Sequence, residues 1–127
     1  MSSAFKTRTK CILANVQQHG KFTIGQEIYT LETLPEGSIW LLDRHPRKGP
    51  DGKSLYVKLP NGALWGVDRR RSNCTKSDNQ EHRCWIRHGV PPNITVNKDG
   101  LTCSAGAGSI DTINWHGFLT DGYLIEI

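Results

Sequence analysis

Short stretches of alternating apolar and polar residues recur along the chain, a period-two pattern typical of β-strands with one buried face. The clearest example spans residues 55–67, where two such runs flank Pro60-Asn61-Gly62. Asn-Gly tolerates the positive φ that a tight turn requires, so this pattern predicts a β-hairpin. Further strands are expected at residues 27–31, 38–43, 82–88, 93–96, 110–114 and 118–127, the last with a turn near Asp121-Gly122.

The first twenty residues fit two descriptions. Ile12 and Val16 are four residues apart and His19-Gly20 resembles a helix C-terminus, which predicts a short helix over residues 8–18. A strand over residues 11–14 is the alternative. We therefore expect an all-β fold, or a mostly β fold with one short N-terminal helix, arranged as a small sandwich or partly open barrel.

The length of 127 residues suits a single domain with one core. Within it we distinguish an N-terminal helix or strand (1–20), a region of strands and a hairpin (21–68), and a β region that contains cysteines and histidines (69–127). No apolar run approaches the roughly 20 residues of a membrane span. Because the N-terminus lacks the apolar region of a signal peptide, we expect a cytoplasmic protein without a membrane partner.

Basic residues outnumber acidic ones by four, and the sequence pI is about 9.0. The basic residues gather near residues 6–10, 44–53 and 69–71. Such runs are usually solvated surface, although they also favour phosphate or acidic partners.

The strongest chemical signal is a cluster of cysteines and histidines between residues 74 and 116. His82 and Cys84 would lie on one face of a strand, roughly 7 Å apart, whereas His88 would lie about 20 Å from His82. We therefore predict a structural zinc site whose ligands are Cys74, His82, Cys84 and Cys103, with His88 and His116 as alternates. Burial of the cysteines as small apolar residues is the competing interpretation, and disulfides are a third.

A catalytic alternative uses the end of the chain. Ser109 follows a glycine-rich loop, and His116 lies seven residues later, where its imidazole could act as general base. Asp111 or Asp121 could orient this histidine. The protein would then be a small hydrolase that uses Ser109 and His116, or an open zinc site.

A third interpretation is binding of single-stranded nucleic acid. Arg83 and Arg87 flank Trp85, which could offer a stacking surface beside positive charge. The basic run of Arg69, Arg70 and Arg71 would add phosphate contacts. Packing of Trp85 in the core is the alternative.

Four stretches of sequence carry a family resemblance: residues 72–75, 82–92, 101–110 and 115–122, the last containing His116-Gly117-Phe118-Leu119. In these stretches the chain resembles a family of small uncharacterised proteins of tailed bacteriophages. That family is related to a bacterial family of unknown function with a C-terminal histidine-hydrophobic-glycine segment. The resemblance implies a bacterial cytoplasm in which thiols remain reduced.

The leading functional prediction is a small phage-type accessory protein that binds a host or phage macromolecule, with a structural zinc ion as a potential stabiliser. A protein partner is the first expectation and a nucleic acid the second. We expect the chain not to be an enzyme, with the hydrolase as the alternative.

Overall fold

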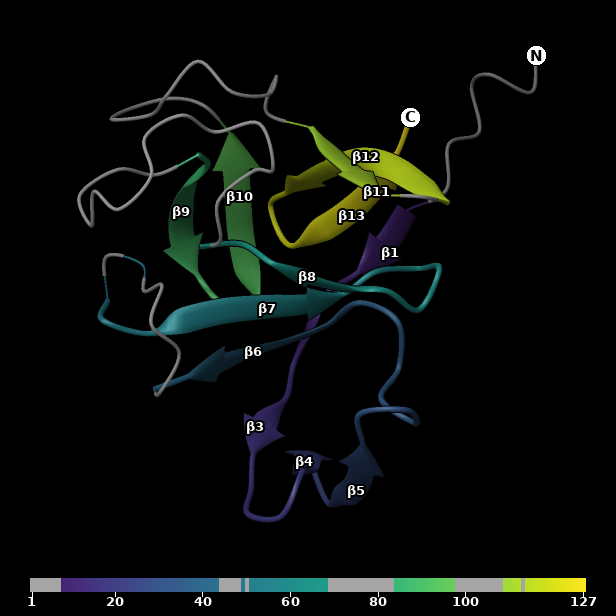
Figure 1. Cartoon of the computed structure of the whole chain (residues 1–127), viewed down its shortest axis with the longest axis vertical. Helices are drawn as coiled ribbons and strands as arrows, with labels where there is room; N and C mark the ends of the chain where they lie inside the picture. The colour runs from purple at the N-terminus through teal and green to yellow at the C-terminus, as the bar shows by residue number, and fades with distance from the viewer. Residues whose placement is uncertain (1–7, 44–48, 50, 69–83, 98–108, 113) are drawn as a thin grey trace.

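The computed structural model describes residues 8–43, 49, 51–68, 84–97, 109–112 and 114–127. These residues form thirteen short β-strands in four sheets, and none of the described residues is helical. Figure 1 shows the strands β6–β8 across the middle of the molecule, β9–β13 on one side of them and β3–β5 on the other. The predicted all-β fold is confirmed, and the sheets form no closed barrel in this part of the chain.

The central sheet contains the hairpin that the sequence predicts at residues 55–67. Its antiparallel strands are β6 (Ser38–Leu42), β7 (Ser54–Lys58) and β8 (Leu64–Gly66). The amide of Leu59 donates to the carbonyl of Ala63 across the turn, at 2.8 Å. Gly62 adopts a φ of 86°, which an L-residue with a side chain rarely adopts.

The second sheet has the order β1-β13-β12-β11. Its strands are β1 (Arg8–Lys10), β11 (Ile110–Thr112), β12 (Trp115–Thr120) and β13 (Tyr123–Glu126). Asp121 and Gly122 form the predicted turn, with φ of 49° and 77°. Positive φ at both central positions suits the right-handed twist of a tight hairpin.

The hairpin of β9 (Ile86–Val90) and β10 (Asn93–Asn97) lies against β12. The amide of Gly122 donates to the carbonyl of Ile94 at 2.9 Å. The strand predicted at residues 82–88 begins later than expected, since Cys84 and Trp85 form a bend before Ile86. The estimate that placed His82 and Cys84 on one extended strand is therefore wrong for Cys84.

The third sheet corrects the prediction for the N-terminus. It consists of β3 (Asn15–Val16), β4 (Lys21–Ile24) and β5 (Glu27–Thr30), all antiparallel. His19 and Gly20, with φ of 59° and 71°, form the turn between β3 and β4 and do not end a helix. The four-residue spacing of Ile12 and Val16 is incidental, because both side chains remain about 40% exposed.

Residues 8–16 form one extended segment that joins three sheets. After β1 pairs with β13, β2 (Ile12–Leu13) runs parallel to β6, and β3 then pairs with β4. The linking residues Cys11 and Ala14 are buried, and their amides donate to the carbonyls of Gly122 and Ile39, both at 2.8 Å. The backbone groups of this segment therefore form hydrogen bonds with strands of three sheets.

The main hydrophobic core lies between the central sheet and the strands β10–β13. Its fully buried side chains include Ile39, Leu55, Ile94, Leu119 and Leu124. A second cluster under β3–β5 is built on Trp40, whose ring lies edge-on to Phe22 at 5.2 Å and is stacked with Tyr56 at 6.1 Å. No helix that could span a membrane occurs among the described residues.

Candidate functional site

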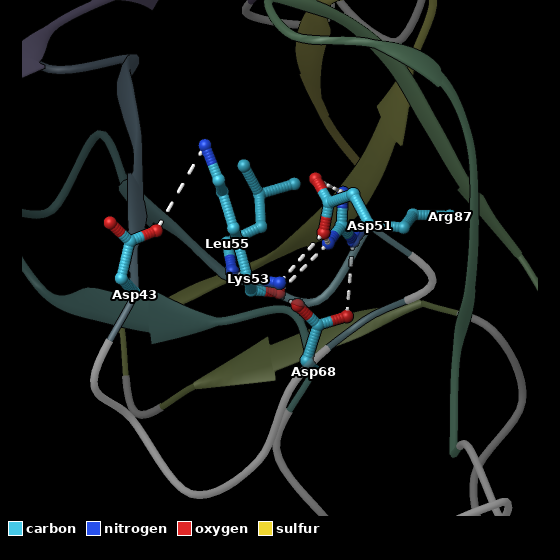
Figure 2. Close-up of polar contacts among 6 residues, drawn as sticks. All are labelled: Asp43, Asp51, Lys53, Leu55, Asp68 and Arg87. Atoms are coloured by element: carbon cyan, nitrogen blue, oxygen red, sulfur yellow. Dashed lines mark hydrogen bonds and ion pairs between the residues drawn. The ribbon is translucent and has the colours of Figure 1, made fainter.

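A buried arginine on β9 lies between the segment that precedes β7 and the turn that follows β8. The side chain of Arg87, on β9, is 5% exposed and contacts two carboxylates. Its Nε donates to Asp68 Oδ1 at 3.1 Å, and its Nη2 donates to Asp51 Oδ1 at 2.6 Å. Figure 2 shows the guanidinium close to both carboxylates, with dashed lines marking its contacts. We call these three residues the Arg87 cluster.

The cluster also fixes the backbone around it. Asp68 Oδ2 accepts the amide of Leu55 at 2.9 Å, and Arg87 Nη2 donates to the carbonyl of Lys53 at 3.0 Å. Gly49 lies against the guanidinium so closely that a Cβ there would collide with it. A buried charge is tolerated when it is paired and its hydrogen-bonding capacity is used, and Arg87 meets both conditions.

Electrostatic contacts favour the charged forms of Asp51 and Arg87. Burial alone would raise the pKa of Asp51, but the hydrogen bonds from Arg87 and the Lys53 amide, with the attraction of the guanidinium, hold that pKa below its ordinary value of 3.8. Burial likewise would lower the pKa of Arg87, but its bonds to Asp51 and the charge of Asp68 raise it. Asp51 and Arg87 therefore carry full charges near neutral pH.

This geometry corrects part of the nucleic-acid prediction. Arg87 is occupied by Asp51 and Asp68 and is therefore not a solvent-facing phosphate ligand. Trp85 is 6% exposed and packs edge-on against Trp65, so its ring is not an open stacking surface. Arg69, Arg70, Arg71 and Arg83 lie outside the described residues.

The Arg87 cluster stands where two basic segments of sequence join the fold. Residues 44–48 contain Arg44, Arg47 and Lys48 and precede Gly49; Arg69, Arg70 and Arg71 follow Asp68 directly. The sequence did not predict a role for Asp51 or Asp68, because each lies in a polar stretch typical of an ordinary turn. The feature that could have indicated them is that each is close to a basic run.

The structure brings together the two predicted catalytic residues. His116 Nε2 lies 3.0 Å from Ser109 Oγ, and Asp111 is directly opposite His116 in the β11–β12 pair. Asp121, the other proposed orienting residue, instead accepts the hydroxyl of Thr95 at 3.3 Å. Both Asp111 and His116 are exposed.

The zinc prediction falls largely on undescribed residues. Cys74, His82 and Cys103 lie outside the described part of the chain, whereas Cys84 is buried at 1% exposure. Of the alternates, His88 is exposed with its Nε2 3.0 Å from Asn97 Oδ1, and His116 contacts Ser109. Among the described residues, no group of three metal-binding side chains occurs. The zinc site stays a prediction.

Thiol labelling tests this prediction, with Cys11 as internal reference. Burial raises the pKa of Cys11 to about 12, so only about one thiol in 10⁴ is ionised at pH 8. We expect iodoacetamide to leave Cys11 unmodified in the native protein and to modify it after denaturation, as measured by peptide mass spectrometry. Zinc ligation predicts that a chelator exposes Cys74 and Cys103 to labelling, while the buried Cys11 and Cys84 stay protected. Labelling of Cys11 in the folded chain would contradict its buried position.

A groove with a volume of about 960 Å³ lies where β3 diverges from β6. It is lined by residues 13–19 and 41–43 and by Lys53, and Leu13 and Val16 expose about 40% of their surface there. These apolar side chains are the kind that a protein partner would cover. The predicted protein partner stays a prediction.

Comparisons with known proteins do not assign a family or a function to the chain. No family model, no curated protein and no solved structure matches the chain.

Proposed function

We propose that the protein binds an anionic macromolecule, and that this partner is a nucleic acid held through its phosphates by the two basic segments. The observation that carries this proposal is the Arg87 cluster. Gly49 and Asp68, the residues to which the segments are attached, both contact one guanidinium. In sequence, Lys48 directly precedes Gly49 and Arg69 directly follows Asp68, so both basic segments are joined to residues that lie beside Arg87.

The distribution of charge supports an anionic partner. The described residues carry six basic and nine acidic side chains, whereas the rest of the chain carries ten basic and three acidic ones. The net charge of +4 is therefore the sum of slightly acidic described residues and a strongly basic remainder of the chain. Concentrated positive charge attracts a polyanion more strongly than the same charge spread over the surface.

The type of basic residue favours phosphate. Five of the six cations at residues 44–48 and 69–71 are arginines, and the planar guanidinium can bind phosphate with two hydrogen bonds. Since Trp85 is buried, the proposed recognition relies on backbone phosphates and not on base stacking at that ring. Binding should therefore depend weakly on base sequence.

Salt dependence provides the test. If all six cations neutralise phosphates, the logarithm of the affinity for a single-stranded oligonucleotide should fall with the logarithm of salt concentration with a slope of about −4. We expect Arg69→Ala/Arg70→Ala to reduce the magnitude of this slope by about 1.5 units. Fluorescence anisotropy of a labelled oligonucleotide between low and physiological salt measures both values.

A charge-matched variant serves as control. Lys10→Ala/Lys21→Ala also removes two exposed cations, but on β1 and β4 of the framework. Equal loss of affinity in the two variants would contradict a localised site. Competition by polyglutamate at matched charge would instead point to an acidic protein as the partner.

The cellular setting is part of the same proposal. The resemblance to tailed-phage proteins implies a partner from the phage or its bacterial host, and a cytoplasmic location would bring the basic segments into contact with nucleic acid. Fractionation of cells that express the chain, with and without nuclease treatment, tests whether the chain is cytoplasmic and whether nucleic acid retains it.

A further inference from the structure

An exposed serine–histidine pair lies on the β1-β13-β12-β11 sheet, and both residues follow the Arg87 cluster in sequence. Ser109 Oγ and His116 Nε2 are 3.0 Å apart, within hydrogen-bond distance. Ser109 immediately precedes β11, and His116 lies on β12, the neighbouring strand. The bond therefore joins two adjacent strands across their outer face.

Strand register places a carboxylate beside the pair. The amide of Ile127 donates to the carbonyl of His116 at 2.9 Å, so the backbone of His116 is directed toward β13. Asp111 and His116 are consequently a non-hydrogen-bonded pair of the β11–β12 ladder, the arrangement in which facing side chains are closest. Ser109 precedes Asp111 by two residues and shares its face.

Apolar side chains border the same face. Phe118 follows His116 by two residues and is 40% exposed, and Ile127, opposite His116, is 54% exposed. An exposed aromatic ring beside a hydroxyl and an imidazole offers contact area to an apolar acyl or aryl group. The face thus combines a potential nucleophile, a base and an apolar support.

We propose that Ser109 is a nucleophile activated by His116 and that it reacts with carboxylic esters that carry an apolar acyl or aryl group. His116 Nε2 accepts the hydroxyl proton while Ser109 Oγ attacks the carbonyl carbon. The intermediate expels the alcohol, which takes the proton from His116 and leaves an acyl-serine. Water, deprotonated by His116, then releases the carboxylic acid and restores Ser109. This site is independent of the proposed nucleic-acid binding.

The Ser109–His116 hydrogen bond would contribute little to the stability of the fold. An exposed hydrogen bond contributes at most about 1 kcal/mol, because water replaces it readily. His88 provides the comparison, since its Nε2 also lies 3.0 Å from a partner, Asn97 Oδ1, on an exposed strand. That partner is an amide and not a nucleophile, so His88 matches His116 in exposure, strand location and hydrogen-bond length but not in the reactivity of its partner.

The test uses p-nitrophenyl acetate and p-nitrophenyl butyrate with the full chain, and peptide mass spectrometry after brief reaction. We expect one acyl group on Ser109, and loss of that group in Ser109→Ala. His116→Gln should slow acylation by about 10²-fold, the usual contribution of a general base, whereas His88→Gln should match the unchanged protein. Ser109→Cys should restore acylation at the same position, which shows that the fold tolerates the change.

Two results would overturn the proposal. One is an undiminished rate in Ser109→Ala with a reduced rate in His116→Gln, since the imidazole would then act alone. The other is acylation confined to lysines or equal in the His88→Gln and His116→Gln variants. Asp111 is a positioning residue in this scheme, so Asp111→Asn should lower kcat while KM and the melting temperature stay unchanged.

Discussion

Arg87→Met should lower the free energy of unfolding by about 3–5 kcal/mol. The substitution leaves Asp68, whose side chain is 3% exposed, as a buried carboxylate without its countercharge. It also removes the donor that holds the Lys53 carbonyl and the Asp51 carboxylate. Urea unfolding followed by tryptophan fluorescence, with unchanged m-value, measures the loss.

Companion variants separate an uncompensated charge from lost packing. Adding Asp68→Asn to Arg87→Met should recover part of the stability, because the amide oxygen still accepts from Leu55 and no buried charge remains. Arg87→Lys keeps the charge but loses the forked geometry, so an intermediate cost is expected. If Arg87→Met costs less than about 1 kcal/mol, the cluster does not hold the loops as described.

The same cluster predicts how stability depends on acid. The pKa of Asp51 is lower in the folded than in the unfolded chain, so its contribution is present above the unfolded value near 3.8 and is lost as the pH falls through the folded value. Because its side chain is 39% exposed, solvent screening limits this contribution to about 1 kcal/mol. The stability difference between the unchanged protein and Asp51→Asn should therefore shrink below about pH 4.

Lys58→Met should cost about 2–4 kcal/mol. Lys58 is 8% exposed, and its ammonium donates to the carbonyls of Leu31, Glu32 and Leu34 at 3.0, 3.1 and 2.9 Å. These three bonds attach the turn after β5 to the end of β7. Met fills a similar volume but donates no hydrogen bond, so the carbonyls lose their partner.

Lys53→Met is the matched control for this prediction. Lys53 lies 3.9 Å from Asp43 with 49% of its side chain exposed, and such surface pairs are worth less than about 1 kcal/mol. A thermal or urea denaturation series on the two variants compares them directly. Equal effects at both positions would mean that the three carbonyls near Lys58 find water in its place.

Local sequence patterns predicted most of the strands, for a definite reason. Turns such as Asn61-Gly62 and Asp121-Gly122 need positive φ, and few residues other than Gly and Asn or Asp adopt it readily. Alternation then marks the strands on each side, as at β7 and β13. The sequence left the choice between helix and strand open for residues 8–18. Their strands pair with β13, β6 and β4, and a local pattern does not show which strands will pair.

The two candidate sites also differ in whether their residues are close together in sequence. Ser109 and His116 were predictable because seven residues and one turn separate them, so hairpin geometry alone brings them together. Arg87 was assigned to the surface because strand alternation cannot tell a buried ion pair from a solvated face. Its partners, Asp51 and Asp68, lie 36 and 19 residues away in sequence.

By itself, then, the sequence determined the β class, the tight turns and the short-range Ser109–His116 pair, because these depend on backbone conformations and side chains within a few residues. Only the tertiary structure decided that Arg87 and Trp85 are buried, that Lys58 holds a distant turn, and that Gly49 and Asp68, which border the two basic segments in sequence, lie beside one guanidinium. Burial and charge pairing depend on which distant strands meet, and no local pattern specifies that.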